Sequence, residues 1–194
     1  TAGMRNTERI QGMSTTRQIA LLHADLAQMN LGVQEVGIND GPAVRAYQAS
    51  CKPPVDAHGP WCAAHVRYRM KQAATQLGIT YDETFPRSGY CPDWSRWYRD
   101  NNRWLPAFAL IQKTTIRMPR KGDHALFYFS TLGRIAHIGI VWRVETWGVY
   151  TIEGNTSPEP SDETCVERDG DGIYMKRRNW SELGQYGGFG LLDF

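Results

Sequence analysis

The sequence predicts an α+β domain in which helices come first and an antiparallel sheet follows. Two patterns lead to this fold class. Apolar residues recur at helical spacing in the N-terminal half, and short runs of β-forming residues alternate with turn residues in the C-terminal half. Strands joined by short turns must pair antiparallel, because parallel neighbours need long crossover connections. Helices followed by strands along the chain are typical of the α+β class.

Three helices are expected in the N-terminal half, each with a recognisable start. The first follows a Ser-Thr-Thr cap, and the second and third each begin with a Gly-Pro pair, where proline suits the first helical position. A glycine or a pair of prolines ends each segment. We place these helices at about residues 15–29, 42–51 and 60–77.

Five strands are expected in the C-terminal half, with Gly-containing turns between most of them. The Asp-Gly-Asp-Gly sequence at residues 169–172 is interpreted as a turn rather than a calcium loop. We place the strands at about residues 125–129, 135–144, 148–152, 173–178 and 190–194.

The segment between them, at about residues 79–118, is rich in aromatic residues. A short helix is expected at residues 92–99, with Asp93 as its cap. One interpretation of its rings, together with Trp61, is a groove wall in which Trp61, Trp94 and Trp97 contact a substrate. The competing interpretation is that the rings pack this insert onto the core.

Composition excludes several classes of protein. The chain has 194 residues, 41% of them hydrophobic, and a net charge of +2. This length and content predict one globular domain with a sizeable core. The weak positive charge does not resemble a nucleic-acid footprint, and no apolar run is long enough for a transmembrane helix. No signal peptide is recognisable at the start. We therefore expect neither nucleic acid nor membrane as a partner.

Four cysteines, at irregular spacings, leave the redox state open. They are Cys51, Cys62, Cys91 and Cys165, and they allow either two disulfides or free thiols. Cys62 stands out because it falls in the first turn of a predicted helix. Unpaired backbone N–H groups and the positive end of the helix dipole favour a thiolate there, although buried cysteines often only pack.

A candidate base lies on a predicted strand. His137 interrupts a run of β-forming residues, and Gly139, its neighbour on the same face, leaves room for a close approach to the ring. Glu153 and Asn155 are two residues apart on the next strand, so either can lie beside His137. A cysteine activated by a base that a carboxylate or amide orients is the general arrangement for nucleophilic catalysis.

Five short motifs, in this order along the chain, resemble the CHAP family of cysteine- and histidine-dependent amidohydrolases and peptidases. They are Asn39-Asp40-Gly41, Trp61-Cys62-Ala63-Ala64, Lys121-Gly122-Asp123, His137-Ile138-Gly139-Ile140-Val141 and Ile152-Glu153-Gly154-Asn155-Thr156. The resemblance implies a papain-like fold over residues 35–194, preceded by a tail and helix over residues 1–34. The insert at about residues 79–118 matches none of the family's motifs, and we therefore expect it to set substrate choice.

The same resemblance implies roles for four residues. Cys62 is expected to be the nucleophile, His137 the general base, Glu153 the group that orients the imidazole, and Asn155 a fourth polar member. No cofactor or metal is expected. The implied substrate is an amide bond of bacterial peptidoglycan, cut by an N-acetylmuramoyl-L-alanine amidase or an endopeptidase. A glutathionylspermidine-like amide is the smaller alternative.

The implied place of action is the bacterial cell wall or periplasm. A phage lysin, an autolysin and an interbacterial toxin with a cognate immunity protein all fit this expectation.

Two departures from the family pattern bear on the site. His65 occupies a position that is usually aromatic, which leaves a second base near Cys62 open. Only Asp40 and Asp56 precede the cysteine as acidic candidates, so no structural calcium is expected.

Two alternatives compete with catalysis. His58, Cys62 and His65 have spacings that zinc ligands can take, although a fourth ligand is not evident. A non-catalytic module that binds the cell wall through its aromatic residues is the other alternative. The basic runs Arg67-Arg69-Lys71 and Arg177-Arg178 are expected on solvated faces.

Overall fold

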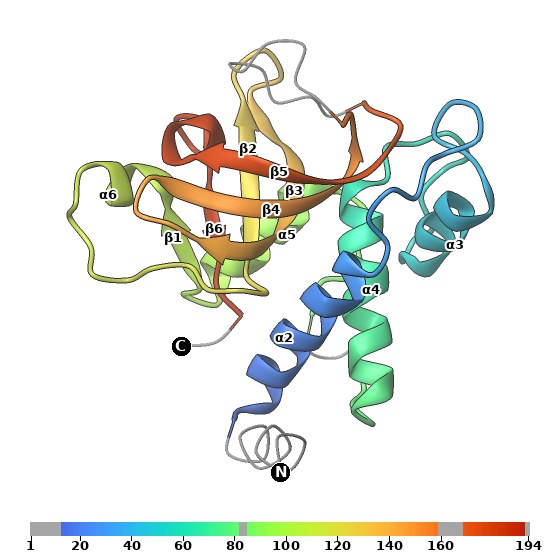
Figure 1. The fold of residues 1–194 in the computed structure, drawn as a ribbon, viewed down its shortest axis with the longest axis horizontal. Helices are drawn as coiled ribbons and strands as arrows, with labels where there is room; N and C mark the ends of the chain where they lie inside the picture. The colour runs from blue at the N-terminus through green and yellow to red at the C-terminus, as the bar shows by residue number, and fades with distance from the viewer. Residues whose placement is uncertain (1–12, 82–84, 159–168, 193–194) are drawn as a thin grey trace.

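The computed structural model describes residues 13–81, 85–158 and 169–192, and it has an α+β fold in which helices precede an antiparallel sheet (Figure 1). This confirms the predicted fold class. Cys165, most of the N-terminal tail, and Asp193 and Phe194 of the expected last strand lie outside the described residues.

The three N-terminal helices are α2 (Thr15–Gln28), α3 (Pro42–Ser50) and α4 (Cys62–Gln76), close to the predicted positions. Ser14 caps α2, where its side chain accepts a hydrogen bond of 3.2 Å from the Arg17 N–H. Helix α4 begins two residues later than predicted, with Trp61 at the N-cap. Cys62 is therefore the first residue of α4.

The middle segment contains α5 (Cys91–Asp100), β1 (Trp104–Pro106) and α6 (Ala107–Ile111). Helix α5 was predicted, but the predicted cap is wrong: Tyr90 occupies the N-cap position, and Asp93 lies in the first turn, 3.2 Å from Arg96. Neither β1 nor α6 was predicted. Both are short, and β1 is extended because it pairs with a strand near the C-terminus.

The remaining strands are β2 (His124–Phe129), β3 (Arg134–Val144), β4 (Gly148–Thr156), β5 (Gly172–Asn179) and β6 (Gly188–Gly190), with a 3₁₀ turn η1 (Trp180–Leu183) before β6. They form one antiparallel sheet in the order β1-β6-β2-β3-β4-β5. The last strand was predicted at residues 190–194, but β6 begins earlier in the sequence and spans residues 188–190. In the sheet it lies between β1 and β2.

Helix α4, which begins at Cys62, is held between the other helices and the sheet. Helix α4 packs against α2, α3, β3 and β4, while α5 packs against β3 (Figure 1). The main core joins Ile19, Val66, Met70, Ile138 and Ile152, all fully buried. A second apolar cluster, with Phe127 and Phe189 among its members, also takes in residues of α6 and η1.

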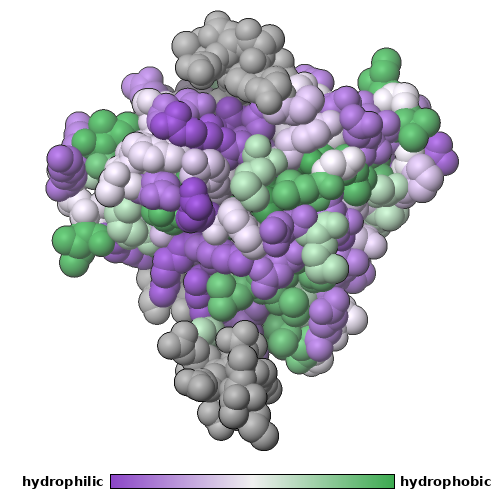
Figure 2. Space-filling view, in the orientation of Figure 1, coloured by the Kyte–Doolittle hydropathy of each residue, from purple (hydrophilic) through white to green (hydrophobic). Residues whose placement is uncertain are grey.

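The molecular surface mixes polar and apolar side chains. Figure 2 shows hydrophilic and hydrophobic residues interspersed on the face seen in Figure 1. Within the described ranges, no helix combines the length and apolar character needed to cross a lipid bilayer.

Two arginines of α4 correct a sequence expectation. Arg67 and Arg69 are buried rather than solvated, with 0% and 4% of their surface exposed, whereas Lys71 is exposed as expected. Arg69 donates a 2.7 Å hydrogen bond to the Tyr47 hydroxyl, and the Arg67 guanidinium lies 5.2 Å from the centre of the Tyr81 ring. Contacts with aromatic rings thus replace water for both cations.

Two buried histidines connect α2 to the sheet. The Nε2 atoms of His23 and His124 are 3.1 Å apart, and His124 Nδ1 lies 2.6 Å from the Tyr98 hydroxyl. Burial lowers the pKa of His23 to about 4 and that of His124 well below its usual value. Both rings are therefore neutral at pH 7 and link α2, α5 and β2.

We expect the free energy of unfolding to fall as the pH drops from 7 to 5. Histidines in the unfolded chain protonate near pH 6.5, whereas His23 and His124 stay neutral when folded. Each of these two histidines therefore lowers the free energy of unfolding by up to about 1.4 kcal/mol for every pH unit below 6.5. Asp123, whose pKa burial raises to about 6, and His137, whose pKa its partners raise to about 9, oppose this trend, whereas His65, whose pKa burial lowers, adds to it. Urea unfolding followed by circular dichroism measures the effect, and equal midpoints at pH 7 and pH 5 would contradict it.

Candidate active site

Cys62 combines burial with the electrostatics of a helix start. Only 3% of its surface is exposed, and as the first residue of α4 its backbone N–H has no acceptor within the helix. The N–H of Ala63 contacts the sulfur and favours its charged form. The thiol therefore lies at the positive end of a 15-residue helix, where an anion is stabilised.

The residue before Cys62 anchors this helix start. Trp61 is fully buried, and its Nε1 donates a 3.0 Å hydrogen bond to Glu35 Oε2. The side-chain amide of Gln48 donates to the carbonyls of Asn39 and Gly59, which fixes the loop that leads into α4. The prediction that Trp61 contacts substrate is wrong, because its ring is enclosed by protein. Its role in this structure is to hold the chain at Cys62.

The structure brings His137 and Glu153 together, as the strand pairing required. The two side chains are fully buried, and His137 Nε2 lies 2.9 Å from Glu153 Oε2. Gly139 is paired with Glu153 across β3 and β4, and a Cβ atom on Gly139 would stand 2.7 Å from Glu153 Cγ. The missing side chain at residue 139 is therefore what lets the carboxylate reach the imidazole.

Glu153 is held on its other side by groups that sequence reasoning missed. Arg178 donates from Nε and Nη2 to the two carboxylate oxygens at 2.9 and 2.8 Å, and the Thr151 hydroxyl donates at 2.6 Å. Arg178 is 2% exposed, so the expectation that it lies on a solvated face is wrong. Alternation along β5 was the available signal, since it places Arg178 on the opposite face from Arg177.

The charges of this site follow from these contacts. Burial alone would raise the pKa of Glu153, but the charge and hydrogen bonds of Arg178, followed by those of His137, hold it well below its usual range. Burial also lowers the pKa of His137, yet contact with Cys62 and Glu153 raises it to about 9. His137 is therefore an imidazolium at neutral pH, paired with a carboxylate.

Cys91 is a second thiol beside the first, at the start of α5. Its Sγ lies 3.6 Å from Cys62 Sγ, and this hydrogen bond is the largest influence lowering the pKa of Cys62. Burial opposes the shift and His137 adds to it, so the pKa of Cys62 falls well below its usual value. Contacts with Cys91 and His137 thus favour the thiolate form of Cys62 over the thiol. Cys51, Cys62 and Cys91 are not linked to one another by disulfides.

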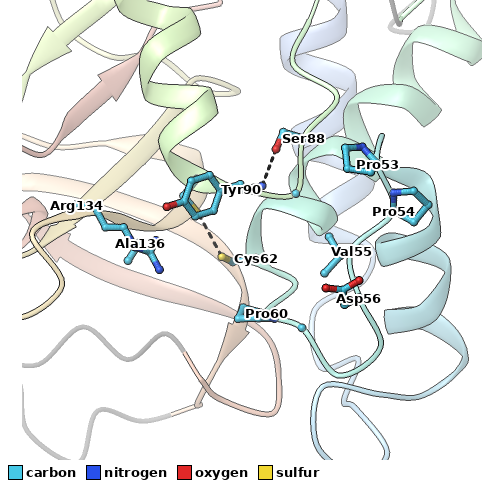
Figure 3. A pocket seen from close by; sticks show the side chains of 13 residues that line it. Pro53, Pro54, Val55, Asp56, Pro60, Cys62, Ser88, Tyr90, Arg134 and Ala136 are labelled. Atoms are coloured by element: carbon cyan, nitrogen blue, oxygen red, sulfur yellow. Dashed lines mark hydrogen bonds between the residues drawn. The ribbon is translucent and has the colours of Figure 1, made fainter.

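A pocket of about 360 Å³ gives access to the thiolate. Figure 3 shows Cys62 facing this pocket, with Tyr90 and Arg134 toward one side and Pro54, Val55 and Asp56 toward the other. Cys91 and Ala136 also line it. Cys62 is therefore part of a pocket wall rather than enclosed on every side.

The tryptophans of α5 lie away from this pocket. Trp94 is fully buried and donates a 2.8 Å hydrogen bond from Nε1 to the Ser88 carbonyl, so the prediction that it contacts substrate is wrong. Trp97 is half-buried and packs near Phe85 and Tyr98, with ring centres 6.0 and 5.1 Å away. The competing interpretation, in which these rings attach the insert to the core, describes their positions.

Asn155 is fully buried in an irregular part of β4. Its φ is 60°, and the pairing of β4 with β5 shifts register between Gly154 and Thr156. The simple rule that residues two apart share a face does not hold across such a bulge. The His137 ring contacts Glu153 through Nε2, and its other neighbour at the site is Cys62. A role for Asn155 stays a prediction.

His65 is buried one helical turn beyond Cys62. Its ring is fully enclosed, 5.3 Å from the centre of the Tyr47 ring, and neither nitrogen has a hydrogen-bond partner among the described residues. Burial, then the nearby charge of Arg69, lowers its pKa well below the usual value. The ring is therefore neutral and packs as an aromatic residue would.

The residues of the zinc alternative do not converge. His58 is exposed, and its Nδ1 lies 2.8 Å from the Ile38 carbonyl, while His65 is enclosed in the core. Across residues 13–81, 85–158 and 169–192, no three histidine, cysteine or acidic side chains are placed to hold a metal ion. Of the two acidic candidates for calcium, Asp40 pairs with Arg45 at 2.5 Å and Asp56 lines the pocket.

Comparisons of this chain with protein-family models, with curated proteins and with solved structures gave no match. The site itself consists of a thiol at a helix start and a histidine that a buried carboxylate orients.

Replacing Cys91 is expected to make Cys62 less reactive at low pH. In Cys91→Ala no donor from residue 91 faces the Cys62 sulfur, so the pKa of Cys62 should rise towards that of an ordinary thiol. Alkylation of Cys62 by iodoacetamide at pH 6, followed by mass spectrometry, should slow several-fold. Cys51→Ser is the matched control, because burial raises the pKa of Cys51 to about 11. Equal rates in all variants would refute this role of Cys91.

His65→Phe is expected to stabilise the fold. The substitution removes two buried nitrogens without partners and keeps a ring against Tyr47, for a gain of about 1–2 kcal/mol at pH 7. Denaturant unfolding measures the gain. A loss of stability would show that the ring nitrogens of His65 have hydrogen-bond partners in solution. Hydrolytic activity in this variant should match the wild type, since His65 is not expected to act as a base.

Proposed function

We propose that this protein is a cysteine amidohydrolase or peptidase of the CHAP type that cleaves an amide bond of bacterial peptidoglycan. The observation that carries the proposal is the pairing of His137 with the buried carboxylate of Glu153, beside a thiolate that opens onto a pocket. Nucleophile, base and orienting carboxylate are the parts that thiol-dependent acyl transfer requires.

The first half of the reaction forms an acyl-enzyme. The thiolate of Cys62 attacks the amide carbon, and the carbonyl oxygen gains negative charge. The backbone N–H of Cys62, which has no acceptor within α4, is suited to stabilise that oxyanion. The imidazolium of His137 gives its proton to the leaving nitrogen, so the amine departs neutral and a thioester remains on Cys62.

The second half releases the acyl group. Neutral His137 removes a proton from water, the resulting hydroxide attacks the thioester carbon, and Cys62 leaves as a thiolate. Glu153 keeps Nε2 of the ring directed at itself and favours the imidazolium that forms at each step. Because the positive charge of Arg178 stabilises the ionised form of Glu153, this carboxylate stays ionised throughout the reaction.

Peptidoglycan is proposed as the substrate because the order of motifs resembles a family that mostly cuts this polymer. The pocket supports a peptide substrate, since its wall extends to both sides of Cys62, with Arg134 on one side and Asp56 on the other. We place the activity in the bacterial cell wall or periplasm, with an immunity protein as partner if the chain is a toxin.

Two alternatives make different predictions. A small amide such as glutathionylspermidine would use the same thiolate, and only the cleaved product tells it apart from peptidoglycan. A cell-wall binding module without catalysis would need neither an ionised Cys62 nor a buried carboxylate beneath His137. The cost of burying the Glu153 and Arg178 charges argues against that module.

Digestion of purified peptidoglycan tests the proposal. The wild type should release soluble fragments, and Cys62→Ala should lower the rate by at least about 10³-fold while leaving the far-ultraviolet circular dichroism unchanged. Cys51→Ala is the control for loss of a buried thiol. Mass spectrometry of the fragments identifies the bond cut. Undiminished release by Cys62→Ala would exclude the mechanism.

A further inference from the structure

A second pocket adjoins the one that holds the thiolate. It has a volume of about 430 Å³ and lies beside α5 and the start of β3. Arg134 lines both pockets, and the neighbouring pairs Cys91–Pro92 and Ile135–Ala136 each contribute one residue to either side. The two pockets are therefore consecutive stretches along one path, with Arg134 between them.

The second pocket has an excess of positive charge. Three arginines line it, Arg96, Arg99 and Arg134, against the single carboxylate of Asp100. Arg96 is shared with Asp93, which lies 3.2 Å away. The pocket therefore keeps a net positive charge when Asp93 is counted with Asp100.

Two of these cations are held by neutral groups. Arg99 lies 4.4 Å from the centre of the Trp104 ring and donates to the Ser95 hydroxyl at 3.3 Å. Arg134 lies 5.1 Å from the centre of the Tyr90 ring and donates to the Ile135 carbonyl. Neither forms an ion pair with a carboxylate among the described residues. Their guanidinium groups are thus oriented by the protein but not neutralised by it.

Aromatic rings form another part of this wall. Tyr128 and Tyr186 meet edge to face, with ring centres 4.9 Å apart, and both line the pocket. A site that joins guanidinium groups to tyrosine rings suits a ligand that carries carboxylates on an extended, partly apolar chain.

We propose that this arginine-lined pocket, bounded by Arg96, Arg99, Arg134, Tyr128 and Tyr186, binds a carboxylate of the peptide whose scissile amide lies at Cys62. The inference rests on the proposed function and specifies its substrate as an acidic peptide with a direction: the carboxylate lies on the Arg134 side of the thiolate. Asp56, on the other side of Cys62 in Figure 3, disfavours the reverse orientation. A phosphate group has the same charge chemistry, and the experiment separates the two.

Binding to the catalytically inactive Cys62→Ala protein tests this site independently of hydrolysis. The probes are a synthetic peptidoglycan stem tetrapeptide with free carboxylates, the same peptide with its carboxylates amidated, and inorganic phosphate. We expect the acidic peptide to bind, and Arg99→Gln and Arg96→Gln each to weaken it about tenfold. Affinity for the amidated peptide should be lower and insensitive to both substitutions. Arg96 is largely exposed, so its variant remains informative if Arg99→Gln fails to fold.

Arg143→Gln is the matched control, because it removes one positive charge from the far end of β3. Its affinity for the acidic peptide should equal that of the parent protein. Equal affinity in all three arginine variants, or no binding of the acidic peptide, would overturn the inference. Phosphate binding that the arginine substitutions abolish while peptide binding persists would overturn the carboxylate assignment. Release of fragments by the wild type from peptidoglycan, measured separately, shows whether the proposed function survives either result.

Discussion

The buried ion pair between Glu153 and Arg178 is the interaction on which the rest of the site depends. A carboxylate without exposed surface would be protonated if it stood alone, and it would then offer His137 no negative charge. Two hydrogen bonds from Arg178 and one from Thr151 keep it ionised. The ionised Glu153 favours the imidazolium of His137, which in turn favours the thiolate of Cys62. Three strands and one helix therefore contribute to a single chain of charges.

This chain also explains why the fold needs both of its layers. The thiolate depends on the first turn of α4, which the helical layer fixes through Glu35 and Gln48. The imidazolium depends on β3, β4 and β5, which the sheet holds in register. Because Cys62 comes from the helical layer and His137 from the sheet, a shift of either layer would separate the thiol from the imidazole.

Local signals account for what the sequence could predict, and distant partners account for what it could not. Caps, Gly-Pro pairs and turn residues located α2 to α5 and β2 to β5, and Gly139 correctly indicated a close approach to His137. Strand β1 escaped prediction because only its pairing with β6 makes it extended. Cys91 and Arg178 escaped because each gains its role from a residue far along the chain. Counting rings predicted Trp61 and Trp94 as contacts, since composition does not tell an enclosed ring from an exposed one.

The pair of thiols at the site carries a consequence for how the protein responds to oxidation. Disulfide sulfurs are about 2.05 Å apart, so 3.6 Å leaves a gap that side-chain rotation can close. A thiolate is the form that peroxide attacks: Cys62 would become a sulfenic acid as hydroxide leaves, and Cys91 would then displace water to form the disulfide. One bond would remove the nucleophile and its hydrogen-bond donor together. Under the proposed function, reactivity toward amides and sensitivity to oxidants therefore have the same origin in this site.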